Sequence, residues 1–141
     1  AGDVNLRMPH YVVGKLQAAL NDRGRAVKGG RVLVLGIAYK RDIDDPRESP
    51  AFEIIDLLLQ LGAHVSYHDP HIPAAPRMRT WPNLPPMQST PLTPATLAGC
   101  DAVLIVTDHR NVDYSLVAKH APLVIDTRGL YRAPLPNVVK A

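Results

Sequence analysis

Four short apolar segments alternate with stretches of helical periodicity, and this alternation restricts the fold more than any other feature of the sequence. The segments run through residues 31–39, 63–70, 101–108 and 122–128. Their leucine-rich and β-branched composition is typical of strands that are covered on both faces. Strands that alternate with helices predict an α/β fold: a Rossmann-like, open, mostly parallel sheet with helices on both faces.

Helix-start and helix-stop residues flank the helical stretches. Ser49 and Pro50 are expected to cap and begin a helix that Gly62 ends. Thr93 and Asp113 are expected to begin two shorter helices in the same way. These signals place one helix after the first strand and one before and after the third.

One long helix is predicted ahead of the first strand. Apolar residues repeat at helical spacing over residues 9–26, and Pro9 suits the first helical position because its missing N–H is not needed there. We expect this helix to lie outside the alternating unit, as an appendage or a bridge to another domain. The tail, residues 133–141, shows no pattern that predicts an element.

Composition narrows the class of protein. Of the 141 residues, 46% are hydrophobic, which is enough for one domain with a single core. The net charge of +3 and the aromatic content of 5% argue against a nucleic-acid-binding protein and favour a small anionic ligand. No apolar run approaches the ~20 residues that cross a membrane. The single cysteine, Cys100, excludes an internal disulfide and is typical of a reducing compartment, so a cytoplasmic location is expected.

Polar residues follow every predicted strand. They are Lys40 and Arg47 after the first, His68 and Asp69 at the end of the second, Thr107, Asp108 and His109 after the third, and Asp126, Thr127 and Arg128 after the fourth. Parallel strands end at one edge of a sheet, so these residues are expected to share that edge. The cations Lys40, Arg47 and Arg128 would supply donors for phosphate or carboxylate groups. The alternative is a solvated salt-bridge loop, in which Asp44, Asp45 and Glu48 neutralise the cations.

Other kinds of site have weaker support. The first strand–helix turn holds Gly36 alone and lacks the G-x-G-x-x-G pattern of dinucleotide-binding domains. Asp69 could bind a ribose, but an Asp-Pro turn explains it better. His64 and His68 are too far apart along an extended strand to share a metal, so no metal site is predicted. Cys100 lies where a small hydrophobic residue packs, and no catalytic residue is assigned in this chain.

The stretch VLVLGIAYKRDIDDPRESPAFEIIDLLLQLGAHVSYHDP closely resembles the C-terminal, UDP-binding domain of the UDP-glucose/GDP-mannose dehydrogenase family. That family reads as a strand, a Gly-hydrophobic-Ala-aromatic-Lys motif, an acidic stretch and D-x-R-E-S-P. The matching residues here are Gly36, Ala38, Tyr39, Lys40, Asp45, Arg47, Glu48, Ser49 and Pro50. The later segments LAGCDAVLIVTDH and LVIDTRGLY are also similar to the family. The beginning, AGDVNLRMPHYVVGKL, resembles the end of the central dimerisation helix in UDP-N-acetylhexosamine 6-dehydrogenases.

The resemblance implies an activity and a set of partners. Family members use NAD to oxidise the C6 alcohol of a UDP-sugar, by way of a thiohemiacetal and a thioester, to a carboxylate. It implies that Lys40 and Arg128 contact the sugar nucleotide and that Arg47 reaches the NAD pyrophosphate. It also implies an N-terminal NAD-binding domain as partner and a homodimer formed through the central helix. Residues 1–28 would be the end of that helix region, and residues 29–141 the sugar-nucleotide-binding domain.

The chain departs from the family pattern in what it lacks. The nucleophilic cysteine with its partners and the N-terminal G-x-G-x-x-G are absent, and Cys100 does not match the nucleophile's motif. We therefore expect a fragment of a longer enzyme that is inactive alone. Two alternatives remain at this point: a stand-alone nucleotide-binding or regulatory module of the same fold, and an interaction domain in which the long helix drives dimerisation.

Overall fold

The structure is a computed structural model that describes residues 2–38, 49–76, 82, 84–132 and 134–141, with side chains in the first helix described from residue 8 onward. Lys40 and Arg47, and with them the acidic residues of the same loop, lie outside the described residues. No helix in the described part of the chain is both long enough and apolar enough to span a membrane.

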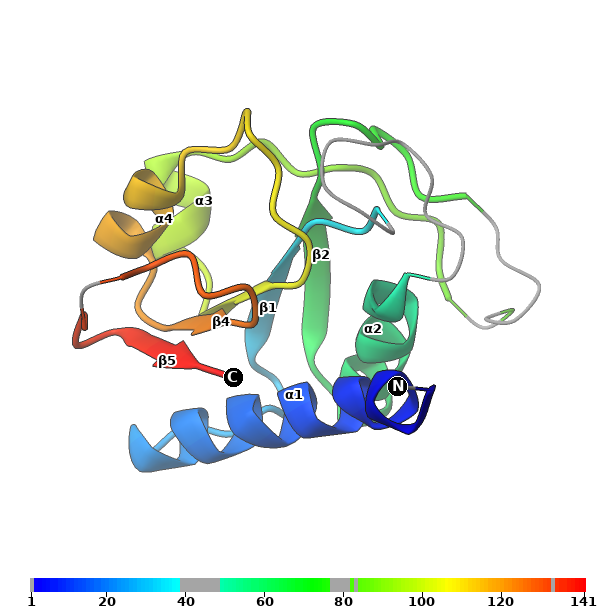
Figure 1. The fold of residues 1–141 in the computed structure, drawn as a ribbon, viewed down its shortest axis with the longest axis horizontal. Coiled ribbons are helices and arrows are strands. Elements are labelled where there is room, and N and C mark those ends of the chain that lie inside the picture. The colour runs from blue at the N-terminus through cyan, green and yellow to red at the C-terminus, as the bar shows by residue number, and fades with distance from the viewer. Residues whose placement is uncertain (1, 39–48, 77–81, 83, 133) are drawn as a thin grey trace.

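A five-stranded sheet forms the centre of the molecule (Figure 1). The strands are β1 (Arg31–Leu35), β2 (His64–His68), β3 (Ala102–Ile105), β4 (Val124–Asp126) and β5 (Val138–Lys140). Their order in the sheet is β2-β1-β3-β4-β5, and every neighbouring pair is parallel. The predicted Rossmann-like α/β fold is confirmed, and its four strands are all present. β5 was not predicted from the tail.

Helices cover both faces of the sheet, as predicted (Figure 1). The helices α1 (Gly2–Asp22) and α2 (Pro50–Gln60) share one face, and the short helices α3 (Pro94–Ala98) and α4 (Tyr114–His120) lie on the other. Alternate residues of β1 serve the two faces: Val32 and Val34 join the core under α1 and α2, while Leu33 and Leu35 join the one under α3 and α4. The central strands β1, β3 and β4 are buried on both faces, which explains their continuous apolar segments, whereas β2 and β5 are only partly buried.

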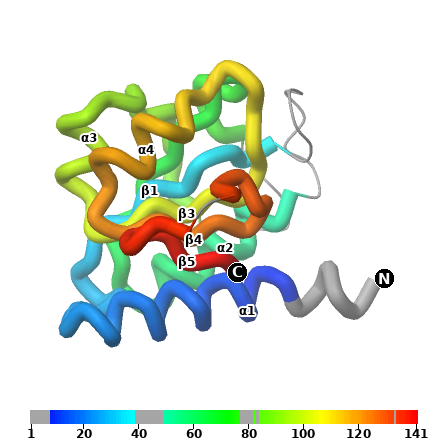
Figure 2. The backbone as a smooth tube through the Cα atoms, turned by 60° about the vertical axis from the view of Figure 1, so that its left-hand side comes forward, coloured from blue at the N-terminus to red at the C-terminus, as the bar shows by residue number. Residues whose placement is uncertain are grey.

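The start of α1 differs from the prediction. The helix begins at Gly2 and ends at Asp22, so Pro9 lies inside it rather than at its first position. Proline costs least in a first turn, but inside a helix it removes one hydrogen bond without excluding the helical conformation upstream. Val12, Val13, Leu16 and Leu20 are buried in the core shared with α2 and the sheet. Figure 2 shows the coloured part of α1 running along one side of the molecule, beneath the sheet.

The predicted helix caps are present. Ser49 precedes α2 and its hydroxyl accepts a hydrogen bond from the Ala51 N–H at 3.2 Å. Thr93 caps α3 and Asp113 caps α4 through the same kind of bond, at 3.1 Å in both cases. Gly62 follows α2 with a φ of +88°, a conformation that favours glycine. Local side-chain chemistry thus fixes where these three helices begin, and Gly62 marks the end of α2.

The strand order creates a switch point between β1 and β3. From β1 the chain crosses to β2 on one side, and the later strands β3, β4 and β5 are added on the other. In open α/β sheets, ligands bind beyond the carboxyl ends of the strands at such a point. The residues that follow β1, β2, β3 and β4 are therefore the place to look for a site.

Candidate functional site

The turn after β1 lies at the switch point and is held by both neighbouring strands. Gly36 has a φ of +85°, and a Cβ on it would lie 2.1 Å from the Thr107 carbonyl oxygen. Its N–H donates to the His68 carbonyl at 2.9 Å. The Thr107 hydroxyl donates to the Ala38 carbonyl at 2.7 Å. The chain therefore leaves β1 along a fixed course between β2 and β3.

Asp69 is the main hydrogen-bond acceptor of this turn. Its Oδ2 accepts the Ile37 and Ala38 N–H groups at 2.9 and 3.1 Å, and its Oδ1 accepts the His71 N–H at 2.8 Å. The same Oδ2 lies 3.0 Å from the His109 Nε2, and both side chains are almost fully buried. The bond to His71 confirms the interpretation of Asp69 as a turn residue. Both carboxylate oxygens bind the protein itself, which argues against the ribose alternative.

The electrostatics of Asp69 follow from these contacts. Burial alone would raise the pKa of its carboxyl. The hydrogen bond from His109, those from the His71 and Ile37 N–H groups, and the charge of His109 act in the opposite direction and outweigh burial. The pKa of Asp69 therefore lies below its ordinary value of 3.8, and the side chain is an anion at neutral pH.

Of the three cations that the sequence predicted at this edge, Arg128 lies among the described residues. Two aspartates bind it. Its Nε donates to the Asp108 Oδ1 at 3.1 Å, and its backbone N–H donates to the Asp126 Oδ1 at 2.9 Å. The Arg128 side chain is 45% exposed, whereas that of Asp108 is 6% exposed. The guanidinium is thus anchored on a buried anion and still open to solvent, which suits the binding of a phosphate or a carboxylate.

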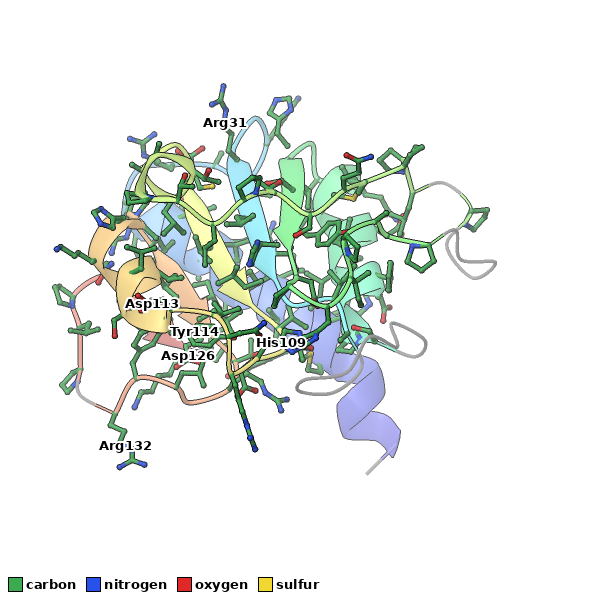
Figure 3. All side chains as sticks on the ribbon, turned by 90° about the horizontal axis from the view of Figure 1, so that it is seen from above. Arg31, His109, Asp113, Tyr114, Asp126 and Arg132 are labelled. Atoms are coloured by element: carbon green, nitrogen blue, oxygen red, sulfur yellow. The ribbon has the colours of Figure 1, made fainter. Side chains whose placement is uncertain are left out.

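The predicted gathering of polar residues at one edge is confirmed for the residues that the structure describes. His109, which follows β3, and Asp126, which ends β4, lie at the same end of the sheet, and Arg31 at the start of β1 lies at the other (Figure 3). Arg128 lies at the carboxyl edge with Asp108. The positions of Lys40 and Arg47 relative to it stay a prediction, because both lie outside the described residues.

Cys100 lies far from this chemistry. It lies two residues before β3, at the opposite end of that strand from Asp108, and its thiol donates to the Thr96 carbonyl at 3.2 Å. Burial, followed by the charge of Asp101, raises the pKa of the thiol. A protonated, buried thiol at the amino edge is a packing residue and not an activated nucleophile.

The described residues also hold no group of three His, Cys, Asp or Glu side chains arranged to bind a metal ion. His68, which the sequence analysis considered as a metal ligand, has its Nδ1 2.7 Å from the Thr90 carbonyl oxygen. His71 and His109 make an edge-to-face ring contact, with centroids 4.7 Å apart.

Sequence reasoning missed three pairings of residues at this edge. It placed Asp108 and Asp126 at strand ends but did not pair either with Arg128. The pairing of Asp69 with His109 was also missed, because the two residues are 40 positions apart in the chain. The sequence did show polar residues directly after each strand. This pattern identifies the carboxyl edge of the sheet but does not indicate which side chains contact one another there.

The chain was compared with known proteins. Residues 33–133 match the family model described as the UDP binding domain of the UDP-glucose/GDP-mannose dehydrogenase family. An NDP-N-acetyl-D-galactosaminuronic acid dehydrogenase of Ralstonia nicotianae is 34% identical over 94% of this chain and 30% of the relative. A UDP-glucose 6-dehydrogenase of Bacillus subtilis is 33% identical over 92% of this chain and 28% of the relative.

Solved structures give a similar result. The UDP-D-ManNAc dehydrogenase of Pyrococcus horikoshii matches with a TM-score of 0.76 and 25% identity, over 98% of this chain and 31% of that one. The UDP-N-acetyl-mannosamine dehydrogenase Cap5O of Staphylococcus aureus matches with a TM-score of 0.67 and 29% identity, over 98% and 31%. The chain therefore spans about 30% of the length of the curated relatives it matches.

Proposed function

The chain belongs to the UDP-glucose/GDP-mannose dehydrogenase family, and from that membership we propose that it is the C-terminal, sugar-nucleotide-binding domain of an NAD-dependent nucleotide-sugar 6-dehydrogenase. The observation that carries the proposal is Arg128, a half-exposed guanidinium anchored at the carboxyl edge of the sheet. The diphosphate group of a nucleoside diphosphate sugar is the anion that this domain would bind there. Lys40 is proposed to bind the same ligand, and Arg47 the NAD pyrophosphate.

The chemical role of this domain is to hold the substrate. In the whole enzyme, the C6 alcohol would lose four electrons as two hydrides to two NAD⁺, and water would supply the second oxygen of the carboxylate. Charged contacts to the remote diphosphate would fix the position of C6 for those transfers, because binding energy far from the reacting atoms can be used for orientation. The residues of this chain would bind and orient the substrate. The nucleophilic cysteine would lie outside this chain, and the main NAD site would belong to an N-terminal domain.

The other parts of the proposal concern the assembly. Residues 1–28 would be the end of a central helix region through which two subunits pair, and residues 29–141 the ligand-binding domain, in a cytoplasmic enzyme of polysaccharide biosynthesis. A UDP-N-acetylhexosamine is the proposed substrate. Support for the acetamido group comes from the beginning of the chain and from relatives named for N-acetylated sugars.

The first experiment measures UDP binding by the 141-residue chain. We expect saturable binding in an NMR titration carried to millimolar UDP, weakened by added salt because the contacts are between charges. Arg128→Ala should raise the Kd about ten- to a hundredfold, the usual cost of losing hydrogen bonds to a charged group. Uridine, which lacks phosphate, should bind far more weakly than UDP.

Arg31→Ala is the matched control. It removes the same charge from the opposite end of the sheet, where Arg31 is exposed (Figure 3). This variant should bind UDP as the original chain does. Equal affinities for UDP and uridine, or equal losses in the two arginine variants, would count against the proposed site. Competition between UDP-N-acetylhexosamine and UDP-glucose tests the acetamido preference separately.

A further inference from the structure

The pairing of Asp108 with Arg128 raises the question of whether Asp108 strengthens or weakens the binding of an anion at this site. A carboxylate next to a cation that binds phosphate reduces the net positive charge of the site. By charge alone, Asp108 should therefore weaken the binding of an anion. Its side chain is 6% exposed and lies 3.1 Å from the Arg128 Nε, which makes it a structural partner rather than a solvated surface charge.

The backbone that carries Arg128 is also fixed. The Asp126 carboxylate accepts the Arg128 N–H at 2.9 Å through one oxygen, and the Leu130 and Tyr131 N–H groups at 2.7 and 3.3 Å through the other. The Thr127 hydroxyl donates to the Ile105 carbonyl at 2.6 Å, which ties this turn to β3. The Arg128 side chain therefore begins from a rigid turn, and its remaining freedom lies in its own rotatable bonds.

Asp108 removes much of that remaining freedom. An arginine has five N–H donors in a planar fork, and the Nε–H is the donor nearest the stem. A bond at Nε fixes the plane of the guanidinium and directs its two terminal nitrogens, which can fork onto a phosphate. Ordering a free arginine on binding would otherwise reduce affinity, because a long side chain loses rotamer freedom.

We propose that Asp108 is a positioning residue for the nucleotide: it orients the Arg128 guanidinium for the diphosphate, and this gain exceeds the repulsion between its charge and the ligand. The inference rests on the proposed function, since it requires Arg128 to bind the nucleotide. It assigns Asp108 a role in affinity with no contact between its carboxylate and the ligand.

The test is the direction of the change in Kd caused by Asp108→Asn, which keeps the shape of the side chain, removes its charge and replaces the charge-assisted hydrogen bond to the Arg128 Nε with a weaker neutral one. Positioning predicts that the Kd for UDP rises about three- to tenfold, the size expected when one flexible side chain must be ordered on binding. Charge alone predicts that the Kd falls. Asp101→Asn is the matched control, because Asp101 also pairs with an arginine, Arg25, but at the amino edge of the sheet. This control should leave the Kd unchanged.

A double-mutant cycle separates positioning from a general disturbance of the fold. In the Arg128→Ala background, Asp108→Asn should no longer raise the Kd, because no guanidinium remains to be oriented. Arg128→Lys is a second test, which leaves Asp108 unchanged. Lysine keeps the positive charge but lacks the Nε–H that donates to Asp108 and fixes the plane of the guanidinium. We expect it to bind UDP within about threefold of Arg128→Ala, since the oriented fork is lost in both.

The outcomes distinguish this inference from the proposed function. If Arg128→Ala weakens UDP binding but Asp108→Asn strengthens it or leaves it unchanged, positioning by Asp108 is wrong while the binding site stands. The same holds if Asp108→Asn weakens binding equally in the presence and absence of Arg128. If the chain does not bind UDP, or if Arg128→Ala binds it normally, the proposed site and this inference both fall.

Discussion

At the scale of single residues, the geometry of the carboxyl edge depends on a backbone position that only glycine can occupy without strain. Gly36 is such a position for two reasons that act together. Its φ of +85° disfavours any residue with a Cβ, and the Thr107 carbonyl occupies the space where that Cβ would lie. The turn after β1 can therefore pass close to β3 only because residue 36 has no side chain.

Gly36→Ala should lower the free energy of unfolding by about 2–5 kcal/mol. The left-handed conformation accounts for about 1–2 kcal/mol and the forced backbone shift for about 1–3 kcal/mol. Urea unfolding followed by circular dichroism measures the change. Gly129→Ala is the control, since Gly129 has a φ of +68° but open space around its Cβ position.

The control should cost only the conformational part, about 1–2 kcal/mol. Equal losses in the two variants would mean that the contact with Thr107 adds nothing, and that the turn can move away from β3 at no cost.

At the scale of elements, α1 is the helix whose position most changes the view of the domain. The sequence indicated an appendage or a bridge to another domain. One face of α1 lies in the same core as α2 and the sheet, so the helix is not a mere appendage, and its role as a bridge stays a prediction. Leu16 and Leu20 are fully buried in that core. The helix is stabilised by tertiary packing. A periodic pattern predicts an apolar face on a helix, but it does not indicate which element that face packs against.

Leu16→Ala should destabilise the domain by about 2–5 kcal/mol, the range for a large-to-small change in a packed core. The neighbouring Gln17 is exposed, so Gln17→Ala should change stability by about 0.5 kcal/mol or less. Chemical unfolding of both variants, observed by far-UV circular dichroism and by tyrosine fluorescence, gives the comparison. A Leu16→Ala variant as stable as Gln17→Ala would mean that α1 does not pack on this domain in solution.

The elements also show which parts of the fold can be predicted from sequence. Four strands and the caps at Ser49, Thr93 and Asp113 follow from local rules, since each depends on residues close together in the chain. β5 could not be predicted, because Val138–Lys140 contributes only two adjacent apolar residues in a proline-containing tail and forms a strand by pairing with β4. The same limit applies to the candidate site. The sequence placed Arg128 at the carboxyl edge, but it could not identify Asp108 as its partner, because the two residues are 20 positions apart in the chain.

At the scale of the whole molecule, Asp69 joins the ends of three strands and makes stability depend on pH. Its pKa in the folded state is below 3.8, so the unfolded chain takes up the proton first as the pH falls. The carboxylate therefore contributes its full stabilisation above the unfolded pKa, and this contribution is lost as the pH falls through the lower, folded pKa. Acid should weaken the junction of β1, β2 and the segment after β3.

Asp69→Asn tests this dependence. The variant should be less stable than the original chain at pH 7, because an amide offers a single acceptor oxygen where the carboxylate offers two, and a buried donor is left unpaired. The difference in the free energy of unfolding should shrink as the pH falls from about 5 towards 2. Asp56→Asn, which changes a half-buried carboxylate on α2 that binds only Gln60 among the described residues, controls for the loss of one charge. A constant difference between Asp69→Asn and the original chain across this range would show that Asp69 does not change its pKa on folding.

The two anchors on either side of residues 39–48 have a practical consequence for protein engineering. Ala38 is bound through both its N–H and its carbonyl, by Asp69 and Thr107, and Ser49 is committed to the start of α2. Residues on either side of this ten-residue segment are therefore held by described residues of the scaffold. A segment of equal length grafted between these points should leave the hydrogen bonds of Ala38 and Ser49 in place, so that the contribution of residues 39–48 to the proposed ligand binding can be measured separately.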